Sequence, residues 1–388
     1  MSITAPQGFR AAGVTAGLKT SGNPDLALVV NDGPSKAAAA VFTSNRVAAA
    51  PVHWSREVVK DGRVDAVILN SGGANACTGP QGFQNTHTTA EKTAEALGIS
   101  ATDIFVCSTG LIGEQLPMDK ILAGIGAATA ALSTDGGSAA ATAIMTTDSV
   151  SKQAVFTGAD ADGKEFTIGG MAKGAGMLAP GLATMLVVIT TDADVQPNML
   201  DVVLRDATRV TFDRADSDGC MSTNDTVVLL ASAASGAVPS AVDFGKGLTQ
   251  VCAELARKLI GDAEGASHDI AIRTFNAASE KDAEVVSRAV ARSNLFKAAI
   301  FGKDPNWGRV LSAVGTTDAA FEPDQLNVSM NGVRICRNGS IGEDRSLVDL
   351  EPREVLVEID LQAGDAEATI WTNDLTHDYV HENSAYSS

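Results

Sequence analysis

Residues 169–192 read GGMAKGAGMLAPGLATMLVVITTD, a glycine-rich segment that runs directly into an apolar one. The run from Met185 to Ile189 is short, continuous and rich in β-branched residues, which is typical of a strand buried on both faces. Five glycines and one proline lie between residues 169 and 183, where they allow tight bends and positive φ angles. We therefore expect a bent loop that leads into a buried strand, with Thr184 at the first position of that strand.

A bent bond between Ala183 and Thr184 would have a chemical consequence. If the Thr184 hydroxyl faced the preceding carbonyl, an N-to-O acyl shift and hydrolysis would leave Thr184 as a new N-terminus. Its α-amino group, with a pKa of roughly 7.7–8, could then accept the proton of its own hydroxyl near neutral pH. Glycine and proline loops before buried strands are also common in proteins without this activity, so spacing alone leaves both interpretations open.

The composition indicates a globular protein without nucleic-acid or membrane partners. The chain has 388 residues, 45% of them apolar, and a formal net charge of −18, which disfavours binding to phosphate backbones. Five cysteines are scattered singly, and an odd count without a CxxC pair argues against a disulfide framework. We find no leader-like segment and no run of about 18 apolar residues. We therefore expect a cytoplasmic protein.

One acidic segment superficially suggests a metal site. Residues 213–219 carry alternate carboxylates, as a calcium loop does. Cys220 occupies the next ligand position, however, and the terminal bidentate Glu is missing. We expect no bound metal.

Hydrophobic periodicity predicts a mixture of strands and helices along the whole chain. The predicted strands span residues 26–30, 38–42, 64–69, 104–107, 185–189, 226–231, 270–275, 326–330, 333–336, 355–361 and 368–372. The predicted helices span residues 86–97, 118–132, 199–212, 247–260 and 285–298. No repeat or low-complexity linker divides the chain, so the pattern predicts an α/β protein of one large or two ordinary domains.

Several polar turns follow predicted strands, where small-molecule sites commonly collect. For Asn75 and Thr78, turn chemistry and ligand contact are equally good interpretations. Thr109 and Gly110 could direct a hydroxyl and an N–H toward a developing oxyanion, although a turn of this kind is usually only a turn. Glu264 lies in a glycine-bounded loop, where an exposed acid is normally inert.

Eight short motifs follow one another in order over nearly the whole chain. They are NSGGANACTG (residues 70–79), STGLIG (108–113), MTTD (145–148), KGAGMLAPGLATML (173–186), STNDT (222–226), DAEG (262–265), DPNWGR (304–309) and ENSAYSS (382–388). Together they resemble the ornithine acetyltransferase (glutamate N-acetyltransferase) family. The fourth motif is similar to the self-processing site of that family.

The resemblance implies an α/β fold of two packed β-sheets sandwiched by helices. It also implies self-cleavage between Ala183 and Thr184, which would make residues 1–183 and 184–388 two chains of one packed body. An α2β2 tetramer of the cleaved pair is the expected assembly.

The resemblance also assigns roles to particular residues. Thr184 would be the nucleophile, and Thr109 and Gly110 would stabilise the oxyanion. The residues implied in substrate binding are Thr146, Lys173, Thr184, Glu264, Asn383 and Ser388.

The implied reaction is a ping-pong transfer of acetyl from N2-acetyl-L-ornithine to L-glutamate through an acetyl ester on Thr184. It needs no cofactor, and acetyl-CoA is an alternative acetyl donor in such a family. Two other classes of function stay open. One is an N-terminal-nucleophile aminopeptidase or amidase of similar architecture, in which water accepts the acyl group. The other is a non-catalytic amino-acid-binding protein with an intact chain.

Overall fold

The computed structural model describes residues 2–179 and 185–385, and the strands within these residues form three sheets. A four-stranded sheet has the order β1-β2-β4-β5, and a five-stranded sheet has the order β3-β9-β8-β7-β6. Their strands are β1 (Phe9–Val14), β2 (Leu26–Asn31), β3 (Ala37–Phe42), β4 (Ala66–Asn70), β5 (Ile104–Ser108), β6 (Lys152–Ala159), β7 (Glu165–Lys173), β8 (Leu186–Thr191) and β9 (Thr226–Ala231). The pairs β4–β5 and β8–β9 are parallel and the other neighbours are antiparallel.

Strand β8 shows how these two sheets pack face to face. Successive side chains of a strand point to opposite faces. Leu186 and Val188 lie in the apolar core between the two sheets. Val187 and Ile189 lie in a second core, which helices α5 (Pro197–Arg209) and α6 (Ala241–Gly261) cover. The prediction of a strand buried on both faces is confirmed, but the strand begins at Leu186 and not at the predicted first position, Thr184.

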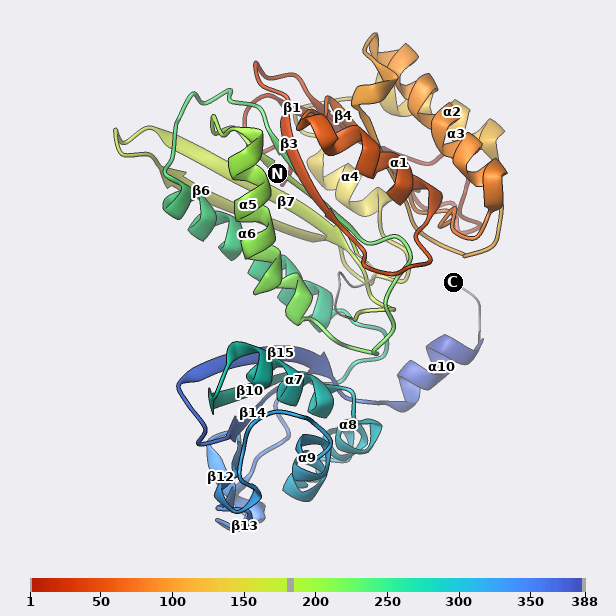
Figure 1. Cartoon of the computed structure of the whole chain (residues 1–388). Helices are drawn as coiled ribbons and strands as arrows, with labels where there is room; N and C mark the ends of the chain where they lie inside the picture. The colour runs from red at the N-terminus through yellow and green to blue at the C-terminus, as the bar shows by residue number, and fades with distance from the viewer. Residues whose placement is uncertain (1, 180–184, 386–388) are drawn as a thin grey trace.

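Helices also cover the outer face of the four-stranded sheet, which completes the predicted sandwich (Figure 1). The covering helices are α1 (Ala50–Val58), α2 (Gly79–Leu97) and α3 (Met118–Ala130). The short helix α4 (Gly137–Ala143) contributes its alanines to the core between the sheets. The predicted arrangement of two packed sheets sandwiched by helices is therefore confirmed.

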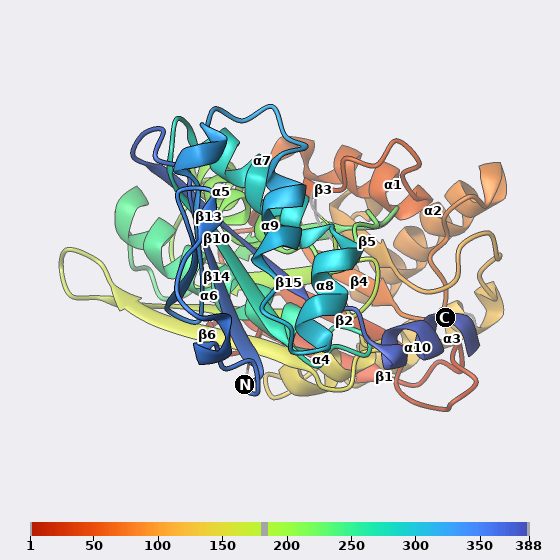
Figure 2. The same cartoon turned by 90° about the horizontal axis from the view of Figure 1, so that it is seen from below.

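A third, six-stranded sheet lies beyond this sandwich, and the predicted fold did not include it (Figure 1). Its order is β13-β12-β11-β14-β10-β15, and only β10 and β14 pair in parallel. The strands are β10 (Asp269–Ala277), β11 (Asn327–Met330), β12 (Val333–Arg337), β13 (Ser340–Ile341), β14 (Glu354–Asp360) and β15 (Ala366–Asn373). Helices α7 (Glu280–Ala291), α8 (Asn294–Phe301) and α9 (Trp307–Val314) share its apolar core and lie over it in Figure 2.

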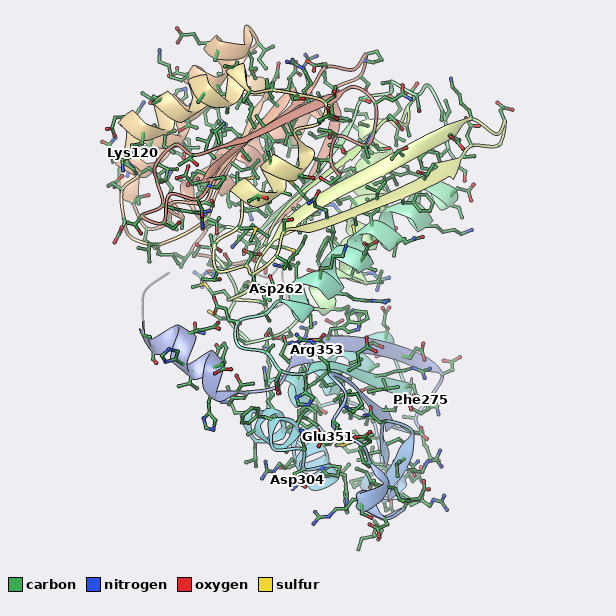
Figure 3. The ribbon with its side chains drawn as sticks, turned by 180° about the vertical axis from the view of Figure 1, so that it is seen from behind. Lys120, Asp262, Phe275, Asp304, Glu351 and Arg353 are labelled. Carbon is green, nitrogen blue, oxygen red and sulfur yellow. The ribbon has the colours of Figure 1, made fainter. Side chains whose placement is uncertain are left out.

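Arg353 joins the third sheet to the end of α6. Its guanidinium donates to the carbonyl of Gly261 at 2.6 Å and forms an ion pair with Asp269. Figure 3 shows Arg353 close to Asp262 at this junction. After β15 the last helix, α10 (His377–Ala385), leaves the sheet toward the side of the molecule on which α2 and α3 lie (Figures 1 and 2).

Two local predictions were wrong. Residues 169–173 are not part of a bent loop but the end of strand β7, and a Cβ on Gly169 would lie only 2.1 Å from the carbonyl oxygen of Ser2. Glycine is needed there for close packing and not for a bend. The predicted helix 285–298 is two helices, α7 and α8, because the Ser293 side chain caps the second by accepting from the N–H of Phe296.

Among the described residues, no helix is both long enough and apolar enough to cross a membrane.

Candidate active site

A cavity of about 230 Å³ lies where the ends of β5 and β7 and the loop after α6 meet helix α10. Six residues that the sequence analysis assigns to the site line this cavity: Thr109, Gly110, Thr146, Lys173, Glu264 and Asn383. Its other walls are Ala74, Ile112, Thr147, Gly176, Met177, Asp218, Cys220, Ser222, Thr223, Asn224 and Tyr379. The remaining predicted site residues, Ala183, Thr184 and Ser388, lie outside the described residues.

Thr109 and Gly110 form a fixed turn at the end of β5. The N–H of Thr109 donates to the carbonyl of Asn70 at 2.9 Å, and the carbonyl of Thr109 accepts from the N–H of Gly73 at 2.9 Å. Gly110 has a φ of +132°, and a Cβ there would lie 2.7 Å from the backbone nitrogen of Gly73. This position therefore requires glycine, because a side chain would be strained and would collide with the opposite backbone.

Lys173 brings a buried amino group to the wall of the cavity. It ends strand β7, is 2% exposed, and donates from Nζ to the hydroxyl oxygen of Thr109 at 3.3 Å. Burial lowers the pKa of Lys173, while the carboxylate of Asp148 acts in the opposite direction. Because the Thr109 oxygen accepts from Lys173, the proton of the Thr109 hydroxyl is available for donation to another acceptor.

Glu264 reaches the cavity from the loop that follows α6. Its Oε1 accepts from the hydroxyl of Thr147 at 2.8 Å, and its Oε2 accepts from the side-chain amide of Asn383 at 3.0 Å. A Cβ on Gly176 would lie 2.7 Å from both carboxylate oxygens, so a side chain at this position would displace the Glu264 carboxylate from where it lies. The Glu264 carboxylate is thus held in place.

A buried ammonium group and a held carboxylate on the walls of one small cavity suit a ligand that carries both charges. An amino acid is such a ligand, because Lys173 complements a carboxylate and Glu264 complements an ammonium group. Tyr379 adds a half-buried phenol, and burial raises its pKa to about 12, so it stays a neutral donor. Within the described residues, no group of three or more His, Cys, Asp or Glu side chains could hold a metal ion.

The sequence analysis assigned none of the eleven other lining residues to the site, among them Thr147, Asn224 and Tyr379. Thr147 contacts Glu264 directly, whereas its predicted neighbour Thr146 lines the cavity without that contact. Both belong to the MTTD motif, so the motif was the available signal. Asn224 fastens the cavity wall, because its amide donates to the carbonyls of Ser108 (2.7 Å) and Ala74 (2.6 Å). Tyr379 lies on α10, a segment without hydrophobic periodicity.

Asn75 and Thr78 do not line the cavity. The hydroxyl of Thr78 donates to Oδ1 of Asn75 at 2.7 Å, and the amide of Asn75 donates to the carbonyl of Gly82 at 2.9 Å, in the first turn of α2. Of the two interpretations left open for this pair, the structure supports turn chemistry. A larger groove of about 1710 Å³ along α5 and α6 contains none of the six predicted residues that line the smaller cavity.

Known proteins resemble this chain from end to end. Residues 10–388 match the sequence profile of the ArgJ family. The arginine biosynthesis bifunctional protein ArgJ of Streptomyces coelicolor is 66% identical over 388 residues, which is 100% of both chains. The protein of the same name from Mycobacterium leprae is 54% identical over 100% of this chain and 96% of its own length.

Solved structures of the same kind are also similar. The ornithine acetyltransferase of Mycobacterium tuberculosis, complexed with ornithine, is 56% identical; the match covers 48% of this chain and 96% of that one, with a TM-score of 0.44. The sequence matches over the full length are decisive. The chain belongs to the ArgJ family, the ornithine acetyltransferases of arginine biosynthesis.

Proposed function

We propose that this chain transfers the acetyl group of N2-acetyl-L-ornithine to L-glutamate through an acetyl ester on Thr184. The observation that carries the proposal is the cavity itself, in which the Thr109–Gly110 turn, the ammonium group of Lys173 and the carboxylate of Glu264 line one space. Membership of the ArgJ family supports acyl transfer, because the relatives that match the whole chain are bifunctional proteins of arginine biosynthesis.

The strand that follows Thr184 supports its assignment as the nucleophile. Thr184 is joined directly to Met185, and the next residue, Leu186, is the Cα partner of Lys173 in the β7–β8 ladder. Lys173 lines the cavity, so β8 begins at the end of the sheet where the cavity lies. The start of β8, two residues after Thr184 in the sequence, therefore lies at the same end of the sheet as the proposed oxyanion donors, which supports the assignment.

The proposed chemistry has two half-reactions. The Thr184 oxygen bonds to the acetyl carbon and passes its proton to the Thr184 α-amino group. The Thr109 hydroxyl and the Gly110 N–H stabilise the oxyanion, the carbon–nitrogen bond breaks, and ornithine leaves with the proton. The α-amine of glutamate then attacks the ester, so that N-acetylglutamate leaves and the Thr184 hydroxyl is restored. The cycle uses no cofactor, and acetyl-CoA is an alternative donor for the same ester.

The walls of the cavity suggest how the substrate is held. In this proposal Lys173 binds the substrate carboxylate, Glu264 with Asn383 and Ser388 binds an ammonium group, and Thr146 contacts the bound amino acid. The enzyme is proposed to work in the cytoplasm as an α2β2 assembly of its two cleaved chains.

Hydrolysis is the second candidate function. An N-terminal-nucleophile aminopeptidase or amidase would use the same donors with water as the acyl acceptor. The 66% identity to a full-length ArgJ protein favours transfer. The two are separated by measuring N-acetylglutamate and free acetate from the same reaction: transfer predicts that the first exceeds the second, and hydrolysis predicts the reverse.

Self-cleavage is tested on the purified protein. Two fragments, residues 1–183 and 184–388, are expected on a denaturing gel, and N-terminal sequencing should find Thr184 at the start of the second. One intact band of the full chain would favour a non-catalytic amino-acid-binding protein. A different second N-terminus would refute the assignment of the nucleophile.

The nucleophile itself is tested with the two segments produced together as separate chains, so that cleavage is no longer required. After exposure to N-acetylornithine, the fragment that begins with Thr184 should gain about 42 Da, one acetyl group, as an acyl-enzyme must. Thr184→Ala should gain nothing, whereas the matched control Thr191→Ala, at the far end of β8, should still gain the acetyl group. An adduct on the Thr184→Ala variant would show that another residue carries the acetyl group.

A further inference from the structure

Asp148 is a buried carboxylate directly behind the cavity, and the proposed reaction gives it no role. Its side chain is fully buried and forms an ion pair with Lys152, which is fully buried as well. Oδ1 also accepts from the N–H of Gly174 at 2.7 Å, and Oδ2 accepts from the N–H of Thr146 at 2.9 Å. Three donors therefore converge on one carboxyl group, two from the same stretch of chain, residues 146–152, and one from the residue that follows β7.

These contacts fasten the segments that carry the proposed substrate-binding residues. Gly174 directly follows Lys173, so its bond to Asp148 fixes the end of β7 from which the Lys173 side chain projects. Lys152 bridges Asp148 to Asp262, which lies two residues before Glu264. One charged cluster, Asp148–Lys152–Asp262, thus sets the positions of both charged walls of the cavity.

Asp148 also supplies a countercharge for Lys173. Burial alone raises the pKa of the Asp148 carboxyl, but the charges of Lys173 and Lys152 and the N–H of Gly174 outweigh burial and lower that pKa to about 2. The carboxyl is therefore ionised near neutral pH. The charged groups that act on Lys173 are Asp148 and Glu264, which are negative, and Lys152 and Lys19, which are positive. Asp225 also acts on Lys173, but burial raises the pKa of the Asp225 carboxyl well above its ordinary value.

An ammonium group as deeply buried as that of Lys173 stays charged only if a negative group compensates for the lost hydration. Asp148 is the strongest such influence on Lys173, ahead of Asp225 and Glu264. A substrate carboxylate can bind to Lys173 only when the lysine is charged.

We propose that Asp148 is a positioning residue: it fixes the end of β7 through the N–H of Gly174 and supplies a negative charge to Lys173, so that the lysine can bind the substrate carboxylate. The inference rests on the proposed role of Lys173 in substrate binding. It goes beyond the proposed reaction, because Asp148 is sealed behind the wall and touches neither the acetyl group nor the nucleophile.

The test is the pH dependence of the Kd for L-ornithine, measured by calorimetry on the full protein. Asp148→Asn keeps the size of the side chain and removes its charge. Loss of this opposite charge lowers the pKa of Lys173 further, so at pH 8 part of the lysine loses its proton and the Kd should rise about threefold or more. As the pH is lowered to 6, Lys173 regains its proton and the Kd should return toward that of the unaltered chain.

Asp262→Asn is the matched control. It removes the same charge and breaks a bond to the same Lys152, but Asp262 is not among the groups that act on Lys173. Any change that Asp262→Asn causes in the Kd for L-ornithine should be the same at pH 6 and pH 8. The proposal would be overturned if Asp148→Asn left the Kd for L-ornithine unchanged or raised it equally at pH 6 and pH 8. An equal loss of affinity at both pH values would show that Asp148 acts only through packing and not through its charge.

If Asp148→Asn does not fold, the unaltered chain still decides the question. Its Kd should stay within about twofold between pH 6 and pH 8, because Asp148 keeps the lysine charged over that range. A rise of about tenfold over the same range would show that Lys173 loses its charge despite Asp148 and would overturn the proposal. Acetyl transfer by the unaltered chain is measured separately, so a failure of the proposed function is distinguishable from a failure of this inference.

Discussion

Replacing Thr109 with valine isolates the contribution of one hydroxyl group. Thr109 is 3% exposed, and valine has nearly the same shape, so Thr109→Val leaves no cavity in the wall. The turn is held through the backbone of Thr109, which bonds to Asn70 and Gly73, and these bonds do not involve the side chain. The substitution should therefore keep the geometry of the site and remove only the hydroxyl.

The size of the effect follows from which hydrogen bonds are lost. One of the two proposed oxyanion donors disappears, while the N–H of Gly110 stays. Loss of a single such donor typically costs about 3–4 kcal/mol in the transition state, which corresponds to a decrease in kcat of about 10²–10³-fold. The ground state loses much less, because only the Lys173 Nζ gives up an acceptor, at 3.3 Å. KM should therefore change by less than about tenfold.

The assay compares kcat and KM for N-acetylornithine in the unaltered chain, in Thr109→Val and in Thr142→Val, after a gel has shown that each preparation is cleaved to the same extent. Thr142 is an exposed threonine of α4 whose hydroxyl bonds to the carbonyl of Ser138, so its replacement controls for the chemical change. A kcat of Thr109→Val within about threefold of the unaltered chain would refute the reasoning and leave Thr109 as a turn residue.

Two further outcomes follow from the contacts around the cavity. Thr147→Val removes the hydroxyl group that donates to Oε1 of Glu264. Because a hydrogen bond to a charged group contributes about 1.5–3 kcal/mol, the Kd for ornithine should rise about tenfold or more. A Kd equal to that of the control variant Thr142→Val would contradict this prediction. The pKa of the Asp148 carboxyl is depressed from its ordinary value of 3.8 to about 2 in the folded protein. Ionisation of Asp148 therefore stabilises the folded state by about 2 kcal/mol at pH values above 3.8. This stabilisation is lost as the pH falls through 2. Urea unfolding should show that the unaltered chain and Asp148→Asn differ in their free energy of unfolding by about 1 kcal/mol less at pH 3 than at pH 7. The same difference at both pH values would contradict this prediction.

The sequence predicted those parts of the fold in which local pattern and burial agree. The run 185–189 is apolar at every position because both faces of β8 are covered, and such a run indicates a strand buried on both faces. Strand β7 did not show this pattern, because Gly169 and Gly170 leave room for Ser2 and Leu255. A glycine that is selected for close approach looks the same in a sequence as a glycine that is selected for a bend.

The site could not be assembled from local pattern, because its contacts join distant segments. The bond between Thr147 and Glu264 spans 117 residues, and the bond between Asn383 and Glu264 spans 119. Periodicity carries no information about such pairs. The resemblance to a known family named Thr109, Lys173 and Glu264 without giving their distances, and it did not name Thr147, whose contact depends on the exact path of the loop after α6.

Glu264 and Asp148 differ in how many of their hydrogen-bond acceptor positions are still open to a ligand, and this difference decides which of them can bind substrate. An ionised carboxylate has about four acceptor positions. Glu264 uses two of them, for Thr147 and Asn383, and lines the cavity, so it keeps capacity for an ammonium group. Asp148 uses three, is fully buried, and does not line the cavity, so no ligand can reach it. The same chemical group therefore serves as a binding group at one position and as a positioning group at the other, and the difference lies in which acceptor positions the fold has already filled.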